Sequence, residues 1–399
     1  MRYAKTVILL CLAIIGSVVA TGCNIAYSSG TQIKDIEFIR AVGIDKVPEG
    51  KIKFTIATQR IIAGGGGGGS EQKLSEIVYS EGRTGFESAR NFWGYSEKRP
   101  FFGHLEYILI GEEAAKDGIL KYLDFFTRDP EVRLNLNVFV VRDNEAGDVV
   151  RLGNAKDKFV FDRLEGLRKH YWGLSMINQV DLMEIMYILD TEYLSLYIPC
   201  VRLIKKTEST DQSGGGGMDI ELQGFAFFEG DKLAGHLERE MARGLNFLIN
   251  KVRSGVLNVR TKNGGMVALE IVSSDRRMKP YLKDGKLHIA VEIEMNSNIA
   301  EIQASEDIFD EENLQYLKTQ SEQLIKDEIR KVIDLAQSKK LDYFGAGDAV
   351  LHKFPGLWED VFEKNWREIF SKVDFEITVR SRINRTYDIK QPIGAKEIE

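Results

Sequence analysis

The stretch KPYLKDGKLHIAVEIEM, residues 279–295, consists of two runs of alternating apolar and polar residues on either side of Asp284-Gly285. Alternation with a period of two is typical of a strand with one buried face, and Asp-Gly is a strong signal for a two-residue hairpin turn. A second hairpin signal lies upstream at 221–237, where ELQGFAFFEGDKLAGHL turns at its Gly-Asp pair. Strands joined by short turns are antiparallel. We therefore expect the second half of the chain to form an antiparallel sheet of consecutive hairpins.

Two helices with apolar stripes are expected after these hairpins. The segment 310–340 repeats apolar residues at helical spacing, which predicts a long helix that packs across the sheet. The segment 357–373, LWEDVFEKNWREIFSKV, predicts a second helix whose aromatic stripe is core, with a docking surface as the alternative. A strand at 374–383 then closes the sheet. The first stripe comprises Leu314, Leu317, Leu324, Ile325, Ile329, Val332, Ile333 and Ala336, and the second comprises Trp358, Val361, Phe362, Trp366, Ile369, Phe370 and Val373.

In the first half of the chain, strands and helices follow one another. The segments FIRAVGIDK, at 38–46, and KIKFTIATQRII, at 51–62, alternate and predict two adjacent strands. A helix is expected to begin near Thr84. The remaining patterns predict strands at 74–81, 105–111, 134–142 and 194–204, and helices at 112–126, 144–152, 158–173 and 178–189. The apolar repeat of the last of these helices consists of Val180, Met183, Met186 and Ile188.

Two glycine tracts interrupt these patterns. Residues 64–69 satisfy the GxGxxG pattern, but no βαβ unit surrounds them, so they predict a loop between strands rather than a phosphate site. The tract at 214–217 follows a polar stretch, and such segments carry few contacts, which predicts a domain boundary.

The expected fold is α+β and multi-domain, with mostly antiparallel or mixed sheets flanked by helices. The expected parts are an N-terminal α+β region of one or two domains at 23–212, a glycine-rich linker or loop at 213–217, and a C-terminal α+β domain at 218–390.

Composition excludes several classes of protein. The 399 residues exceed what one hydrophobic core usually serves, and 43% hydrophobic residues with 29% charged residues indicate a folded chain. The net charge is -6, and basic residues are interleaved with acidic ones, which argues against a nucleic-acid partner. The only cysteines are Cys11, Cys23 and Cys200, so no disulfide framework is expected. None of the five histidines lies in an HExxH motif, and we expect no metal site, cofactor or catalytic residue.

The N-terminus has the pattern of a secretory signal. Arg2 and Lys5 precede an uncharged apolar run at 7–20, which is shorter than the roughly 20 residues of a membrane-spanning helix. The small residues of ATGC then lead directly to Cys23, as in the lipobox of bacterial lipoproteins, although Ala20 stands where leucine is commonest. We expect residues 1–22 to be a lipoprotein signal peptide and Cys23 to be lipidated, with diacylglycerol and palmitate as the anchor. The alternative is a secreted soluble protein cleaved after Gly22.

Taken together with the lipobox at Cys23, four further segments resemble the Ger(x)C family, the lipoprotein C subunits of nutrient germinant receptors in endospore-forming bacteria. The order and spacing of these segments are more specific than any one of them. They are EFIRAVGIDK at 37–46, GHLEYILIGEEAAKDGILKYLDFFTRD at 103–129, LQGFAFFEGDKLAGHLERE at 222–240 and LDYFGAGDAVLHKFPGLWEDVFEKNWREIF at 341–370.

This resemblance implies a non-enzymatic subunit of a membrane receptor that is needed for spore germination. It implies a lipid anchor on the outer face of the spore's inner membrane and two integral-membrane partners, termed the A and B subunits. It assigns no catalytic residues. The alternatives are a solute-binding lipoprotein of a transporter, which would have two lobes of repeated βα units around a cleft, and a surface hydrolase, for which the sequence has no nucleophile-elbow or metal motif.

Single residues outside these segments favour structural roles. His104 could make a pH-sensitive contact, but a histidine at a turn is more often structural. Asp124, Arg128 and Asp129 could form a binding cluster, although the first two are one helical turn apart and are expected to pair. Cys200 is expected to be a small buried apolar residue, and the acidic run at 306–313 is expected to begin the long helix.

Overall fold

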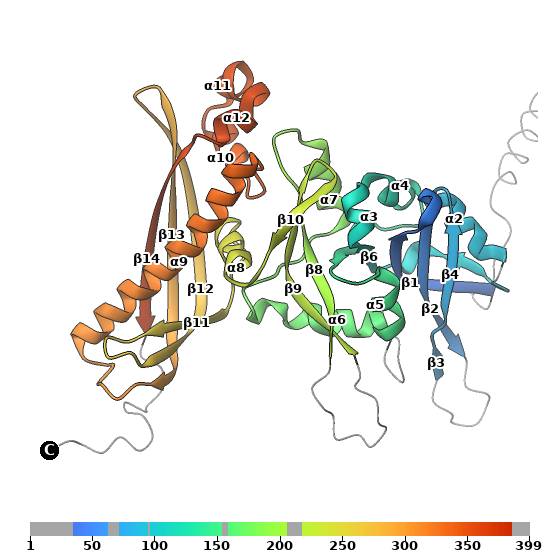
Figure 1. Ribbon diagram of the computed structural model, residues 1–399, viewed down its shortest axis with the longest axis horizontal. Helices are drawn as coiled ribbons and strands as arrows, with labels where there is room; N and C mark the ends of the chain where they lie inside the picture. Colours follow the sequence, from blue (N-terminus) through green and yellow to red (C-terminus); the bar gives the residue numbers. More distant parts are fainter. Residues whose placement is uncertain (1–34, 63–71, 95, 154–158, 206–217, 385–399) are drawn as a thin grey trace, which may run out of the picture.

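The computed structural model describes residues 35–62, 72–94, 96–153, 159–205 and 218–384. Two β-sheets stand beside each other in an elongated molecule, each flanked by helices (Figure 1). This arrangement confirms the α+β class with mixed sheets. Among the described helices, none combines the length and the apolar character that crossing a membrane requires.

The larger sheet has ten strands in the described part of the chain. Its main path runs β10-β9-β8-β7-β6-β1-β2-β3, with β4 paired to β2 and β5 paired to β1. The strands are β1 (Ile36–Lys46), β2 (Ile52–Ile62), β3 (Gln72–Leu74), β4 (Ile77–Gly82), β5 (Arg99–Phe101), β6 (Tyr107–Gly111), β7 (Asn137–Val141), β8 (Tyr197–Lys205), β9 (Met218–Glu229) and β10 (Lys232–Leu237).

The centre of this sheet is parallel, and its edges are antiparallel. Strands β1, β6, β7 and β8 pair in parallel, whereas β2 and β9 continue the sheet with antiparallel pairing. All residues of β6 and β7 are buried, as expected for parallel strands that have helices on both faces. Helices α5 (Ala146–Gly153) and α6 (Val160–His170) pack on one face. Helices α2 (Gly85–Asn91), α3 (Glu112–Asp117), α4 (Leu120–Arg128) and α7 (Leu182–Asp190) pack on the other.

Local signals explain where two of these helices begin and end. The side chain of Thr84 accepts a hydrogen bond from the backbone N–H of Glu87, so Thr84 is the N-cap of α2, as predicted. The single helix predicted at 112–126 is wrong, because α3 and α4 are separate. Gly118 lies between them with φ of 106°, a conformation that no residue inside a helix adopts.

The strands on either side of the second glycine tract pair with each other. The strand β8 precedes it and β9 follows it, and they are antiparallel neighbours in the larger sheet. The hairpin of β9 and β10 turns at Gly230-Asp231, as predicted, but it extends this sheet instead of belonging to the second one. Residues 64–69 and 214–217 lie outside the described residues, and the domain boundary at 213–217 stays a prediction.

The smaller sheet has the order β11-β12-β13-β14, with β11 (Gly255–Arg260), β12 (Met266–Lys283), β13 (Lys286–Gln303) and β14 (Asp374–Asn384). The hairpin turn at Asp284-Gly285 is confirmed, and both residues have the positive φ that such a turn requires. The antiparallel order expected from the hairpins holds for β11, β12 and β13, whereas the closing strand β14 pairs with β13 in parallel. The chain passes through several helices between these two strands, and a long crossover allows parallel pairing.

The helix α9 (Glu311–Lys339) packs along the smaller sheet (Figure 1). Its N-cap is Asp310, whose carboxylate accepts hydrogen bonds from the backbone N–H groups of Glu312 and Asn313, which confirms the role expected for the acidic run. The predicted stripe is largely buried. Its buried members are Leu317, Ile325, Ile329, Val332, Ile333 and Ala336.

The single helix predicted at 357–373 is a chain of short turns. After α10 (Ala346–Lys353) come α11 (Pro355–Leu357), a π-helical turn (Trp358–Phe362), a 3-10 turn (Glu363–Asn365) and α12 (Trp366–Phe370). The aromatic residues recur every four residues, whereas an α-helix turns in 3.6, so a regular helix would carry them progressively off one face. The wider π-helical turn compensates for this drift. The aromatic residues are buried, which confirms that they are core, while Val361 is exposed.

The two sheets are joined through α8 (Arg239–Leu248), a helix that the sequence patterns did not predict. Gly244 lies against α9 so closely that a Cβ atom there would be 2.6 Å from the carbonyl oxygen of Glu328. The neighbouring Arg243 forms a buried ion pair with the Glu328 carboxylate. Asn178, before α7, donates a hydrogen bond to Asn246 of α8 at 2.9 Å. Buried polar contacts thus fix α8 against both halves of the molecule.

Candidate partner-binding surface

A groove of about 1360 Å³ lies between α2, α4 and α7 on one face of the larger sheet, and we call it the α4–α7 groove. Apolar side chains line this groove and remain open to solvent. Their exposed fractions are 55% for Phe86, 55% for Leu120, 56% for Met183, 38% for Met186 and 58% for Tyr187. Exposed apolar clusters of this kind mark sites of interaction, and methionine adapts its shape to different partners.

The sequence of α7 explains why apolar residues point outward. The helix LMEIMYILD is apolar around most of its circumference, and it buries Leu182, Ile185 and Ile188. The predicted repeat is therefore wrong at Met183 and Met186, which face the groove. A short helix that is apolar on two sides can pack one side on the core and present the other to a partner. The apolar residues on both sides of α7 can be seen in the sequence.

Charged residues also line the groove. Arg128 and Asp124 pair at 2.9 Å one turn apart on α4, which confirms the predicted helix-end pairing. Asp129 accepts a hydrogen bond from the backbone N–H of Glu131. Lys121 pairs with Asp117, and its ammonium group helps to hold the pKa of that carboxyl well below its usual range. Exposed apolar residues beside charged residues of both signs are a composition that suits a protein-binding surface.

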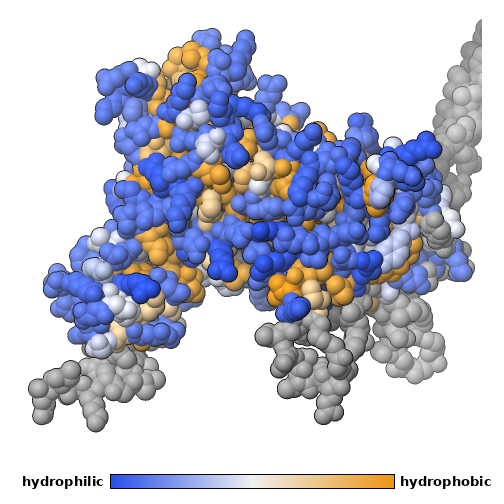
Figure 2. Space-filling model, in the orientation of Figure 1, coloured by the Kyte–Doolittle hydropathy of each residue, from blue (hydrophilic) through white to orange (hydrophobic). Residues whose placement is uncertain are grey.

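Other apolar side chains reach the surface in smaller patches. On the face drawn in Figure 2, hydrophilic residues predominate, and apolar residues appear over α6 and at the apex that α11 and α12 form. At this apex Leu357 and Val361 are exposed.

Two further candidate residues have structural surroundings. The ring of His104 packs edge-on against Phe38 at 4.9 Å, at the end of a short 3-10 turn. Cys200 is buried in β8, as predicted, and burial raises the pKa of its thiol well above the ordinary value. A buried neutral thiol is a poor nucleophile. Cys23 lies outside the described residues.

Two buried aspartates, Asp45 and Asp342, occupy equivalent positions at the starts of two helices. Asp45 accepts hydrogen bonds at 2.7 and 2.8 Å from the first two backbone N–H groups of α5. Asp342 does the same at 3.0 and 2.7 Å for α10, and it also accepts one at 3.1 Å from the indole N–H of Trp366. Both helices begin with Ala-Gly-Asp, a repeat that could have revealed these caps from the sequence. Burial raises the pKa of both carboxyl groups, that of Asp342 to about 6.

The raised pKa of Asp342 predicts a pH-dependent stability. The carboxyl ionises near pH 3.8 in the unfolded chain and near pH 6 in the folded chain. Between these values the folded chain binds the proton more tightly than the unfolded chain does, so the free energy of unfolding falls as the pH rises. We expect Asp342→Asn to remove this loss, so that between pH 4 and pH 7 the variant gains about 3 kcal/mol relative to the wild type. Urea unfolding of both proteins at the two pH values measures the difference. An identical difference at pH 4 and pH 7 would contradict the raised pKa.

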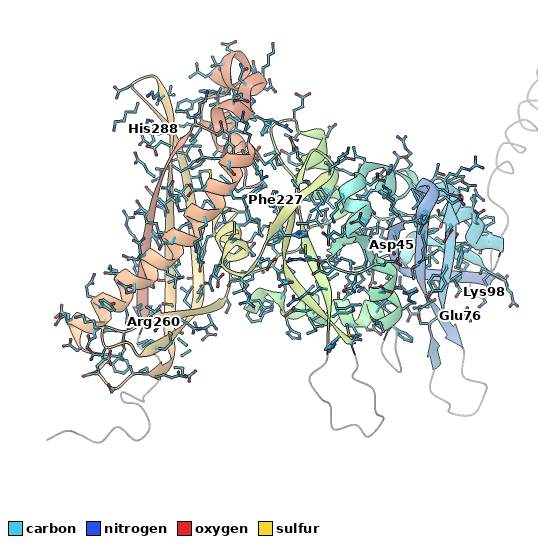
Figure 3. The ribbon with its side chains drawn as sticks, viewed as in Figure 1. Asp45, Glu76, Lys98, Phe227, Arg260 and His288 are labelled. Carbon is cyan, nitrogen blue, oxygen red and sulfur yellow. The ribbon has the colours of Figure 1, made fainter. Side chains whose placement is uncertain are left out.

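One group of side chains in the described part of the chain has the composition of a metal site, and the expectation that the protein has no such site stays a prediction. The group consists of His288, Asp374 and Glu376. His288 lies in the smaller sheet, at the opposite end of the molecule from Asp45 and the larger sheet (Figure 3). This group is therefore separate from the α4–α7 groove.

Comparison with known proteins defines the class. A family model described as "Spore germination protein N-terminal domain" matches residues 29–203, and one described as "Spore germination B3/ GerAC like, C-terminal" matches residues 223–387. The chain belongs to the Ger(x)C family of spore germination proteins, which confirms the resemblance seen in its sequence.

Individual relatives match almost the whole chain. Spore germination protein KC of Bacillus subtilis (strain 168) is 23% identical over 408 aligned positions, which cover 97% of each chain. Spore germination protein B3 of the same organism is 26% identical over 366 positions, covering 88% of this chain and 92% of its own. The crystal structure of the GerBC protein superposes with a TM-score of 0.55 at 21% identity, covering 88% of this chain and 99% of the other. This last likeness shows the shared fold.

Proposed function

We propose that this protein is a lipid-anchored, non-catalytic subunit of a membrane nutrient germinant receptor and is needed for spore germination. The observation that carries the proposal is similarity over 97% of the chain to a spore germination protein, together with family matches on both halves. In this proposal the protein is held on the outer face of the spore's inner membrane. Its partners there are the integral-membrane A and B subunits.

The anchor in this proposal is diacylglycerol on Cys23, with palmitate as a further acyl chain. Two acyl chains give stable attachment to a membrane, whereas one gives only marginal attachment. Cys23 lies thirteen positions before Ile36, the first residue of β1, and even a fully extended chain over those thirteen steps spans only about 45 Å. The larger sheet is therefore kept within reach of proteins embedded in the same membrane.

The α4–α7 groove is the surface that we assign to such a partner. Its occupant would be a segment of an integral-membrane subunit that lies outside the bilayer and presents apolar side chains. Met183, Met186 and Tyr187 offer an apolar contact on one helix, and the charged residues that also line the groove restrict how a partner can approach. Tethering both proteins to one membrane raises their effective concentration, so a modest groove can give a stable complex.

The architecture also favours a receptor subunit over the alternatives. A solute-binding lipoprotein would repeat βα units in two lobes around a cleft, whereas the smaller sheet is built mainly from β11, β12 and β13 in antiparallel order. Asp45 and Asp342 have raised pKa values, but both cap helices inside the protein. These two carboxyl groups hold the ends of helices inside the protein, so neither is placed to act as the general acid or base of a surface hydrolase.

The proposal is tested by isolating the tagged protein from solubilised spore membranes after feeding cells a clickable fatty acid. We expect the wild type to carry the label and to co-purify with the A and B subunits. Cys23→Ser should lose the label and germinate more slowly on nutrients. Met183→Glu should keep the label but lose the membrane subunits, because a carboxylate in the apolar groove must be desolvated on binding.

A matched control for the groove is Val272→Glu. Val272 is 51% exposed, close to the 56% of Met183, but it lies on β12 of the smaller sheet. This variant should keep both the label and the membrane subunits. Absence of label on the wild type would refute the anchor, and normal nutrient germination of spores that lack the protein would refute the receptor role. Equal co-purification of the Met183→Glu and Val272→Glu variants would refute the groove as the contact.

A further inference from the structure

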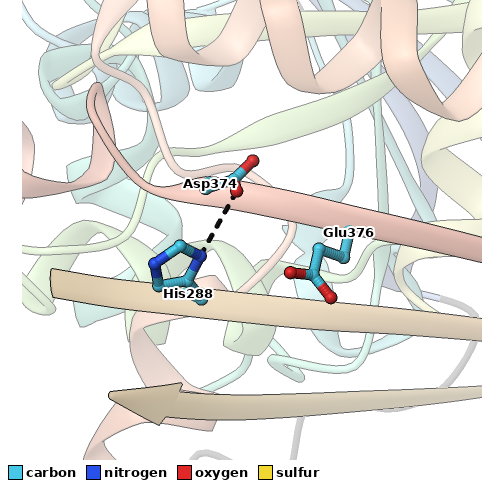
Figure 4. A group of neighbouring side chains, drawn as sticks. All are labelled: His288, Asp374 and Glu376. Carbon is cyan, nitrogen blue, oxygen red and sulfur yellow. Dashed lines mark ion pairs between the residues drawn. The ribbon is translucent and has the colours of Figure 1, made fainter. Parts of the chain in front are cut away.

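Three side chains converge at the end of the smaller sheet near the β12–β13 turn (Figure 4). His288 of β13 lies opposite Asp374 in the parallel pairing with β14, and Glu376 follows two residues later on the same face. The residues that alternate with them, including Ile289 and Phe375, are buried in the core. His288, Asp374 and Glu376 therefore point away from the core, on the outer face of the sheet.

The distances between their donor atoms suit a metal ion. One ligand atom from each residue lies within 4.8 Å of the others, and the Nδ1 atom of His288 is 3.3 Å from an oxygen of Asp374. Zinc binds imidazole nitrogen and carboxylate oxygen at about 2.0–2.2 Å, so two ligands of one tetrahedral ion are roughly 3.3 Å apart. The first pair already has this separation. Glu376 is exposed, and one of its oxygens lies within 4.8 Å of the other two ligand atoms.

The imidazole of His288 has a nitrogen atom without a hydrogen bond. Its side chain is only 15% exposed, and Nδ1 is shielded from solvent and makes no hydrogen bond in spite of its approach to Asp374. A shielded nitrogen without a hydrogen bond is unfavourable, and a bound ion would satisfy it. The same atom faces Asp374 across the space where an ion would lie (Figure 4).

Tyr281 holds two of the three ligands in place. Its ring stacks on the imidazole of His288, with centroids 5.3 Å apart and an interplanar angle of 20°. Its hydroxyl group donates a hydrogen bond to Glu376. Residues that orient metal ligands in this way strengthen binding by about 10- to 100-fold.

We propose that His288, Asp374 and Glu376 bind a divalent transition-metal ion, with Zn²⁺ as the best match. A set of one borderline imidazole and two hard carboxylates suits zinc or manganese better than calcium or magnesium, since those two ions prefer oxygen ligands alone. The nearby Lys279 is paired with Glu292 at 2.8 Å and leaves the two carboxylates available. Three protein ligands leave at least one position of the ion for water or for a group from another molecule. The ion would join β13 to β14.

Calorimetric titration of the purified full-length chain, first freed of metal with a chelator, tests the site with ZnCl₂ and MnCl₂. We expect one saturable zinc site, weaker manganese binding, and a rise in unfolding temperature of roughly 5 °C at zinc concentrations about 100 times the dissociation constant. His288→Ala and Glu376→Gln should each weaken binding at least tenfold. Tyr281→Phe should weaken it by about tenfold, because it removes only the orienting hydrogen bond.

The matched control is Glu294→Gln, which removes a carboxylate from β13 that pairs with Arg380 outside the cluster. It should bind zinc like the wild type, and circular dichroism should show that every variant is folded. The proposal is overturned if zinc does not saturate one site or if all variants bind it equally. It is also overturned if His288→Ala lowers the unfolding temperature by the same amount with and without zinc, since the histidine would then serve only as the ion-pair partner of Asp374.

Discussion

Replacing Trp366 with alanine is expected to lower the free energy of unfolding by about 3–5 kcal/mol. Trp366 is 2% exposed and packs between Trp358 and Phe370, with ring centroids 5.2 and 6.0 Å away. The substitution would leave a cavity in the aromatic cluster and would also remove the indole N–H that donates to the buried Asp342. Urea unfolding followed by fluorescence or circular dichroism measures the loss.

Two further variants separate these effects. Trp366→Phe keeps most of the aromatic volume and loses only the hydrogen bond to Asp342, so it should cost about 1–3 kcal/mol. Val361→Ala changes an exposed residue of the same segment and should alter stability by no more than about 0.5 kcal/mol. A loss below about 1 kcal/mol for Trp366→Ala would show that the aromatic cluster is not a tightly packed core.

Replacing Arg243 with alanine should destabilise the junction of the two sheets by about 3–5 kcal/mol. The side chains of Arg243 and Glu328 are only 6% and 4% exposed, and the guanidinium also donates a hydrogen bond to the carbonyl oxygen of Val256 at 2.8 Å. Without Arg243, the carboxylate of Glu328 would be buried between α8 and α9 without its counter-charge. Chemical unfolding of the purified variant measures the change.

The double variant Arg243→Met with Glu328→Leu provides the comparison for this pair. Apolar side chains of similar volume avoid the unpaired charge, so the double variant should regain most of the lost stability. Arg128→Ala removes a partner from the exposed pair with Asp124 and should change stability by less than about 1 kcal/mol. If Arg243→Ala were as mild as Arg128→Ala, the buried pair would not fix α8 against α9.

The sequence predicted the helices and strands better than their arrangement. The alternation in β1, β2 and β13 and the helix starts near Thr84 and at the acidic run 306–313 were recognised because each depends on neighbours in the chain. The helix α8 was missed. Its residues include Gly244 and the buried charge of Arg243, which are unusual inside a helix and are explained only by the close approach of α9.

The candidate sites show the same limit. The lipobox at Cys23 is a local motif, and the sequence alone could single it out. The α4–α7 groove combines residues from three helices, and the cluster of His288, Asp374 and Glu376 combines two strands separated by α9. No spacing in the sequence links such residues, because their distances depend on how distant segments pack.

The sequence by itself determined the family, the hairpin at Asp284-Gly285 and the burial of the aromatic residues around Trp366. These features follow from residue order, turn chemistry and hydrophobic periodicity, which act over a few residues. Only the tertiary structure decided that β14 runs parallel to β13, that the β9–β10 hairpin extends the larger sheet, and that Met183 faces solvent. The physical reason is that strand direction and exposure are set by which surfaces remain uncovered after the rest of the chain has packed, and a local pattern carries no information about those surfaces.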